Sequence, residues 1–342
     1  MSAKQPSISG RVHAGRRKTL LQLLAAGAAC TSLSPVRVWA KGAYPKQPVR
    51  IVVGFAAGAA TDAFARVVAR KLGDAMGQQF IVENKPGAAT RIAMDHVCRS
   101  DADGYVLGFA TAVTTAFPLM FEGMAFAPGK DFTPVSMLGR APMYLVVRSS
   151  LPVKTYAEFV EYGKKHGNLT FGHQGVGSNP HLAGMTLADS ANMKIVPVPY
   201  KGGGPVAVAL GSDEVDFGML EYAAIRAMLE RGAVRLIMVT EPKRSTLRPD
   251  IPTGRELGVP PEVEGLAPWF MLIAPAGTPP AVIQVLNDQL KSAINLPDVR
   301  EALNGLGIEG EYTTSDQAAQ YFQAQRERIE RLVSDLHISI KT

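Results

Sequence analysis

Short apolar runs of β type alternate with amphipathic stretches along the chain after residue 40. The run at 49–53 leads through a glycine-containing loop into residues 61–76, whose apolar side chains recur on one helical stripe, and Gly77 is placed to end that helix. This alternation predicts an α/β protein with parallel sheets covered by helices on both faces. The expected strands are 49–53, 79–83, 106–110, 143–148, 169–172, 195–198, 215–219, 236–239 and 270–274.

Two glycine-containing loops, at 54–62 and 83–89, each follow an expected strand and precede an amphipathic stretch. Ligands of open α/β sheets bind beyond the carboxyl ends of the strands, where helix N-termini present free N–H groups and partial positive charge. In the first loop Gly58 permits unusual backbone angles, and Thr61 or Asp62 is suited to cap the helix. Taken alone, the loop is also explained as a turn before a capped helix. It matches neither glycine-rich nucleotide motif.

A similar loop at 172–184 repeats the arrangement in the second half of the chain. Ser178 is expected to cap a helix whose first turn contains Pro180. Ser178 and His181 are three residues apart, so a nucleophile and base pair completed by Asp189 or Asp216 is an alternative. The surrounding residues are not G-x-S-x-G, and such a spacing more often caps or packs a helix. A glycine turn at 198–205 follows the next expected strand.

Residues 1–40 have the features of an export signal. Arg16, Arg17 and Lys18 precede an apolar run at 20–29, and a small-residue cleavage pattern ends at Ala40. The run is about half the length that a membrane-spanning helix needs. The paired arginines fit the twin-arginine route, and the general secretory route stays open. Lipid attachment at Cys30 is a further alternative.

The positive net charge of the chain belongs to this export segment. Its six basic and no acidic residues, once removed, leave 30 Lys plus Arg against 30 Asp plus Glu. The basic stripe that would mark a nucleic-acid binder is missing, and nothing in the sequence argues for a polybasic membrane surface. Cys98 alone remains after cleavage and cannot form a disulfide within its own chain. His96 stands two residues before it, a spacing that does not bring two helical side chains together on a metal ion.

Motifs spread over nearly the whole chain together resemble the Bug-type extracytoplasmic receptors of tripartite tricarboxylate transporters. The segments that carry this resemblance are Tyr44-Pro45-x-x-Pro48-Val49-Arg50-Ile51-Val52-Val53, Ala59-Ala60-Thr61-Asp62, Val82-Glu83-Asn84-Lys85-Pro86-Gly87-Ala88, Asp103-Gly104-Tyr105, Gly177-Ser178-x-x-His181-Leu182-Ala183-Gly184, Val198-Pro199-Tyr200-Lys201-Gly202 and Ala274-Pro275-Ala276-Gly277-Thr278-Pro279.

The resemblance implies a periplasmic binding protein fold of the type II class, with two α/β domains, two crossovers and a ligand cleft between the domains. The first domain would comprise 44–144 and 267–342, and the second 145–266, with a returning strand at 269–274 and a closing helix at 316–336. The family implies a periplasmic protein that binds a small carboxylate, without catalysis or cofactor. A monomer is the simplest expectation for a receptor that closes on a hinge, and no metal ligands are expected. Its partner would be the membrane subunits of the transporter; a sensor kinase ectodomain is the alternative.

The family pattern also implies which residues bind the ligand. Asp62 is the least expected residue in a site for an anion, since its ionised carboxylate repels an anionic ligand unless other groups hydrogen-bond to that carboxylate. Three features depart from the usual family pattern: Arg91, Glu221, and Ala56-Ala57 in place of proline. We hypothesise that Arg91 or Glu221 adjusts ligand specificity. Both residues also fit a role as surface charges. The implied ligand-binding residues are Phe55, Gly58, Ala59, Ala60, Thr61, Asp62, Thr111, Gln174, Ser178, Asn179, His181, Lys201 and Gly202.

Overall fold

The computed structural model describes residues 44–124 and 126–338. The predicted export signal at 1–40, with its cleavage site at Ala40 and with Cys30, lies outside these residues. From Tyr44 onward the chain forms one compact unit. Within the described residues, no helix combines the length and the apolar character that crossing a bilayer requires.

The first sheet contains six strands in the order β11-β4-β10-β3-β1-β2. Strand β1 is parallel to β2 and β3, whereas β10 is antiparallel to β3 and β4, and β4 is antiparallel to β11. The strands of this sheet are β1 (Val49–Val53), β2 (Phe80–Asn84), β3 (Val106–Thr111), β4 (Phe132–Arg140), β10 (Trp269–Pro275) and β11 (Glu309–Gly310).

The second sheet contains five strands in the order β7-β6-β8-β5-β9. Strand β6 is parallel to β7 and β8, and β5 is antiparallel to β8 and β9. The strands of this sheet are β5 (Met143–Arg148), β6 (Leu169–His173), β7 (Ile195–Pro199), β8 (Phe217–Glu221) and β9 (Val234–Val239).

The prediction of parallel sheets is therefore wrong in part, because both sheets are mixed. The chain passes from β4 to β5 through residues 141–142 and returns from β9 to β10 through residues 240–268. Strand β5 enters the second sheet, and β10 enters the first, at the edge where the parallel strands of that sheet end. Each therefore runs antiparallel to those strands. Strand β4 was not predicted at all. Its Pro134 and Gly139 weaken the β pattern, and two register shifts against β10 accommodate it.

The other predicted strands are confirmed to within two residues, and so is the first helix. In α2 the stripe residues Phe64, Val68 and Leu72 are buried, and Gly77 ends the helix in the left-handed conformation. The helices are α2 (Ala60–Met76), α3 (Arg91–Cys98), α4 (Phe117–Met120), α5 (Tyr156–His166), α6 (Asn179–Ser190), α7 (Gly203–Gly211), α8 (Tyr222–Glu230), α9 (Pro280–Ile294), α10 (Pro297–Gly305) and α11 (Ser315–Asp335), with 3-10 turns η1 (Ala88–Thr90), η2 (Ala112–Ala116), η3 (Arg255–Leu257) and η4 (Pro261–Val263).

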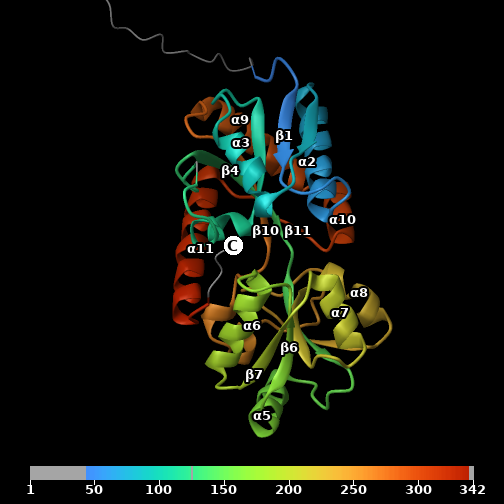
Figure 1. The fold of residues 1–342 in the computed structure, drawn as a ribbon. Coiled ribbons are helices and arrows are strands. Elements are labelled where there is room, and N and C mark those ends of the chain that lie inside the picture. Colours follow the sequence, from blue (N-terminus) through green and yellow to red (C-terminus); the bar gives the residue numbers. More distant parts are fainter. Residues whose placement is uncertain (1–43, 125, 339–342) are drawn as a thin grey trace, which may run out of the picture. The chain divides into compact units, whose positions relative to one another are not determined.

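The C-terminal helix α11 belongs to the cores of both sheets. Ala318 and Phe322 pack with the core of the first sheet, and Ile329 and Leu332 pack with that of the second (Figure 1). A capping box of Thr314 and Gln317 starts this helix, within one residue of the predicted position. Helix α11 therefore packs against both sheets, and its apolar side chains contribute to both hydrophobic cores.

Helix α6 lies against β6 through a close contact at Gly184 (Figure 1). A Cβ atom on Gly184 would lie 2.0 Å from Cζ of Phe171. The Phe171 ring cannot retreat easily, because it stacks on Phe217 with 5.0 Å between ring centroids and is fully buried. The absence of a side chain at Gly184 therefore sets how closely α6 approaches the sheet.

We expect Gly184→Ala to lower the free energy of unfolding by about 1–3 kcal/mol, since overpacking a dense core costs that much. The matched control is Gly305→Ala in α10, where an added Cβ meets no atom within 4 Å; it should leave stability unchanged or raise it by up to about 1 kcal/mol. Urea denaturation of both variants measures the difference. Equal effects of the two substitutions would contradict the packing argument.

Candidate functional site

The loops that the sequence singled out lie at the carboxyl ends of parallel strands. In the first sheet, β1 is followed by residues 54–59 and α2, β2 by residues 85–90, and β3 by η2. Because β1 is parallel to both neighbours, these segments share one edge of the sheet. This is the edge at which open α/β sheets bind ligands.

The first loop presents backbone N–H groups at the start of α2. The first helical hydrogen bond is donated by Ala63 to the Ala59 carbonyl, at 2.9 Å, so the N–H groups of Ala60, Thr61 and Asp62 precede it. The residue in the N-cap position is Ala59, without a side-chain cap, so the prediction that Thr61 or Asp62 caps the helix is wrong. Gly58 has φ 86° and turns the loop into the helix. Three backbone donors therefore remain available for an anion.

The Asp62 carboxylate is engaged within the protein. It accepts hydrogen bonds from the Gly58 N–H at 2.9 Å, from Arg66 Nε at 2.9 Å and from Asn84 Nδ2 at 2.8 Å. The Arg66 hydrogen bond is the main reason that the pKa of Asp62 falls to about 2, with the Gly58 and Asn84 bonds contributing further. Asn84 also donates to the Phe55 carbonyl, at 3.0 Å. Asp62 is thus an ionised carboxylate, partly neutralised by Arg66, that ties the first loop to the end of β2.

Three threonine hydroxyls near this edge are buried without a hydrogen-bond partner in the described part of the chain: Thr90, Thr111 and Thr114. Only Thr111 among them was expected at the site. An unpaired buried hydroxyl costs free energy, so a bound water or ligand is the natural partner. In the sequence, Thr90 could have been identified by its place just after the second glycine loop, and Thr114 by its place three residues beyond Thr111.

Thr90 is held where it is by an unusual backbone. Ala88, Ala89 and Thr90 all have positive φ values, of 44°, 49° and 76°. Side-chain-bearing residues rarely adopt this conformation, and it persists where the surroundings enforce it. A Cβ on Gly54 would lie 2.4 Å from that of Thr90, so the end of β1 admits Thr90 only because Gly54 has no side chain.

The second sheet repeats the arrangement with three helix N-termini. The parallel strands β7, β6 and β8 lead to α7, α6 and α8, whose N-cap residues are Gly202, Ser178 and Glu221. Each helix N-terminus carries partial positive charge, and all three begin at the same edge of this sheet. Gly202 has φ 108°, as expected for a glycine turn, and Lys201 beside it is exposed.

The predicted cap at Ser178 is confirmed, and the same contacts oppose the nucleophile alternative. The Ser178 hydroxyl accepts a hydrogen bond from the His181 N–H at 3.3 Å and donates its proton to the Gly175 carbonyl at 2.8 Å. The His181 Nδ1 accepts from the Gly177 N–H at 3.2 Å, so its ring proton is on Nε2. No hydrogen bond between the hydroxyl and the imidazole is formed among the described residues. Asp216 instead binds Arg148 and Thr170.

His173 is a site residue that the sequence reasoning missed. It is the last residue of β6, one position beyond the predicted strand, and its ring centroid lies 4.3 Å from that of His181. Its Nδ1 is buried without a partner in the described chain. Burial lowers the pKa of His173, and burial together with the neighbouring His173 lowers that of His181 to about 4. Both imidazoles are therefore neutral at pH 7.

The remaining predicted residues have defined contacts. Gln174 Nε2 donates to Glu221 Oε2 at 2.7 Å, and Asn179 Nδ2 donates to the Leu266 carbonyl in the returning segment at 2.8 Å. The Arg91 guanidinium lies 4.7 Å from the centre of the Phe121 ring, a cation–π contact that occupies it. Asn179 and Arg91 therefore have structural contacts of their own, and their contact with a ligand stays a prediction.

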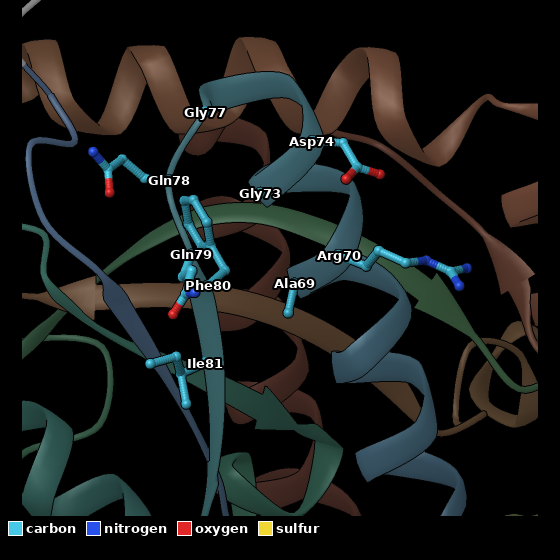
Figure 2. A pocket seen from close by; sticks show the side chains of 9 residues that line it. All are labelled: Ala69, Arg70, Gly73, Asp74, Gly77, Gln78, Gln79, Phe80 and Ile81. Atoms are coloured by element: carbon cyan, nitrogen blue, oxygen red, sulfur yellow. The ribbon is translucent and has the colours of Figure 1, made fainter.

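An open hollow of about 500 Å³ lies elsewhere, between the C-terminal half of α2 and the start of β2 (Figure 2). It is bordered by Arg70, Asp74 and Ile81 among others, at the end of α2 remote from Gly58. It is not part of the loop edge described above. Across 44–124 and 126–338, no three His, Cys, Asp or Glu side chains are grouped so as to hold a metal ion.

Comparison with known proteins decides the family. Residues 64–338 match the family model described as the tripartite tricarboxylate transporter family receptor. The chain belongs to this family. The predicted resemblance is thereby confirmed. So is the predicted periplasmic binding protein fold, since solved structures of a periplasmic transporter and of a TctC solute binding protein from Polaromonas match this chain with TM-scores of 0.71 and 0.78. The domain ranges predicted from the sequence stay a prediction.

Three relatives illustrate the family. The protein BugT of Bordetella pertussis is 32% identical over 305 residues, covering 87% of this chain and 92% of BugT. The structure of Rhodopseudomonas palustris Rpa4515 with adipate is 30% identical, with a TM-score of 0.72, and covers 87% of this chain and all of that one. MatC from the same organism, with bound malate, is 32% identical with a TM-score of 0.66 over 85% of this chain. The chain is thus a solute-binding receptor of a periplasmic receptor family.

The depressed pKa of His181 predicts that acid destabilises the protein. Since the folded-state pKa is about 4 and the ordinary value is 6.5, the unfolded chain takes up the proton first. Stability is then lost as the pH falls from about 6.5 to about 4, by up to about 3 kcal/mol. His181→Asn removes this contribution, so the stability difference between parent and variant should shrink as the pH falls. Urea denaturation at pH 7.5, 6 and 5 measures it, and groups common to both proteins cancel. A difference that does not change with pH contradicts the assignment.

Proposed function

We propose that this chain is a periplasmic receptor that captures a small carboxylate and delivers it to the membrane subunits of a tripartite tricarboxylate transporter. The observation that carries the proposal is the gathering of backbone donors at helix N-termini beside buried, unpartnered threonine hydroxyls. Such groups bind anions without a basic side chain. Two structural relatives with adipate and malate, both carboxylates, support the ligand class.

The proposed site uses groups from both sheets. Free N–H groups of Ala60 and Thr61, together with the Thr111 hydroxyl, would hold one carboxylate at the first sheet. The N-termini of α6 and α7, at Ser178 and Gly202, would face the rest of the ligand from the second sheet. Hydrogen bonds to charged groups contribute about 1.5–3 kcal/mol each, and a micromolar dissociation constant needs about 8 kcal/mol net. A handful of such bonds is therefore sufficient, even after part of the association cost.

The proposed receptor performs no chemistry on its ligand. The Ser178 proton is directed to the Gly175 carbonyl, and the neutral His181 uses its Nδ1 as an acceptor from the backbone. Neither group is arranged to activate the other. A sensing role, with the bound form presented to a sensor kinase ectodomain, would use the same site, and loss of uptake of the ligand on deleting the receptor gene separates transport from sensing.

The test is a thermal-shift screen of the chain from Lys41 against a carboxylate library, with calorimetry on each hit and electrospray of the protein as purified. A ligand at 100 times its dissociation constant stabilises the folded state by about 2.7 kcal/mol. One saturable carboxylate released unchanged supports the proposal. No hit in the whole library contradicts carboxylate binding, and a chemically altered ligand contradicts the absence of catalysis.

The Thr111 hydroxyl provides a sharper test. We expect Thr111→Val to weaken binding of the identified carboxylate tenfold or more, because it removes a hydrogen bond to a charged group worth about 1.5–3 kcal/mol. Stability should not fall, since the removed hydroxyl has no partner in the described chain. Thr186→Val in α6 is the matched control, because it removes another buried hydroxyl without a partner. Equal affinities of the two variants in calorimetry would refute a role for Thr111.

A further inference from the structure

Glu221 is an acidic side chain at the centre of the second loop edge that carboxylate capture does not use. It ends β8, which lies between β6 and β5, and it is the N-cap residue of α8 without capping that helix through its side chain. Its Oε2 accepts the hydrogen bond from Gln174 Nε2 at 2.7 Å, and Gln174 follows β6 directly. The two side chains therefore bridge the ends of adjacent parallel strands.

The neighbouring residues place Gln174 and Glu221 at the loop edge of the second sheet. A Cβ on Gly203, the first residue of α7, would lie 3.1 Å from Gln174 Nε2, so the amide lies against the start of that helix. Two residues beyond Glu221, the Ala223 Cβ would lie 2.9 Å from a Cβ added to Gly307, which precedes β11 of the first sheet. The start of α8 is thus where a segment of the first sheet approaches the second.

Glu221 has no ion-pair partner among the described residues, unlike Asp62 and Asp216. Asp62 pairs with Arg66, and Asp216 pairs with Arg148. Burial raises the pKa of Glu221, and only hydrogen bonds from its own backbone N–H and from Gln174 oppose that shift. Glu221 is partly buried. A carboxyl group in that position without a counter-charge is costly, and a cationic ligand group beside it would lower that cost.

We propose that Glu221 makes this receptor select carboxylates whose far end carries a hydrogen-bond donor, above all an ammonium group, over dicarboxylates of the same length. The inference rests on the proposed function, because it concerns the end of the ligand opposite the captured carboxylate. An ammonium group donates charge-assisted hydrogen bonds to the Glu221 carboxylate. A second carboxylate at the same place faces a like charge, or requires Glu221 to take up a proton.

The experiment compares matched ligands by calorimetry at pH 7.5 on the chain from Lys41. The ligands are 4-aminobutanoate, 5-aminopentanoate and 6-aminohexanoate, each against the dicarboxylate of the same number of carbons. At the best length, the parent protein should bind the amino acid at least tenfold more tightly than the dicarboxylate. Glu221→Gln keeps the shape and the acceptor for Gln174, and it should weaken amino-acid binding at least tenfold and abolish the preference.

The matched control is Glu230→Gln, which removes the same charge from the exposed, opposite end of α8. It should leave the preference unchanged. Thermal unfolding of each variant establishes that it folds; should Glu221→Gln not fold, Glu221→Asp withdraws the carboxylate by one methylene and should reduce the preference.

The outcomes separate this inference from the receptor proposal. A parent protein that binds dicarboxylates as tightly as the amino acids, or a preference that survives Glu221→Gln, overturns the role of Glu221 alone. Binding of some other carboxylate from the wider screen, without binding of any of the three amino acids, also overturns the role of Glu221 alone. Failure of every carboxylate to bind overturns the receptor proposal and this inference with it.

Discussion

Parallel pairing of strands decides where the candidate site lies. Because β1 runs alongside β2 and β3, and β6 alongside β7 and β8, each triplet ends at a single edge. The helices that follow begin there with N–H groups that no preceding turn can satisfy. The proposed anion binding would thus follow from topology, and the loop residues would support it by keeping side chains small, as at Gly58 and Gly202, so that the donors stay accessible.

Polar contacts at the crossings join the two sheets. Arg140, at the end of β4, hydrogen-bonds Glu311 and Tyr321 and lies 3.6 Å from Glu241 just beyond β9. Burial raises the pKa of Glu241 to about 7, against the opposing effect of Arg140. Glu309 of the first sheet in turn accepts a hydrogen bond from Ser245, at 2.8 Å. Together with the two cores that α11 shares, these bonds give the crossings defined geometry.

The buried titratable side chains at the loop edges carry little net charge. The two histidines are neutral, and the charge of Asp62 is opposed by Arg66. Attraction for an anion therefore comes from backbone dipoles, which do not titrate, so an anionic end would be held over a wide pH range. Under the proposal above, the Glu221 carboxylate would influence which second functional group is accepted, because it has no ion-pair partner among the described residues.

The sequence by itself determined the elements whose signals lie within a few residues. The stripe of α2 with its stop at Gly77, the Ser178 cap and the glycine turns could all be predicted, since helical period and backbone angle are local properties. Only the tertiary structure decided the antiparallel course of β5 and β10, the membership of β4, the bonding of Asp62 to Asn84 and the contact between the His173 and His181 rings. Strand direction depends on where the chain re-enters a sheet, and each side-chain partner is brought close by a fold that no short window contains.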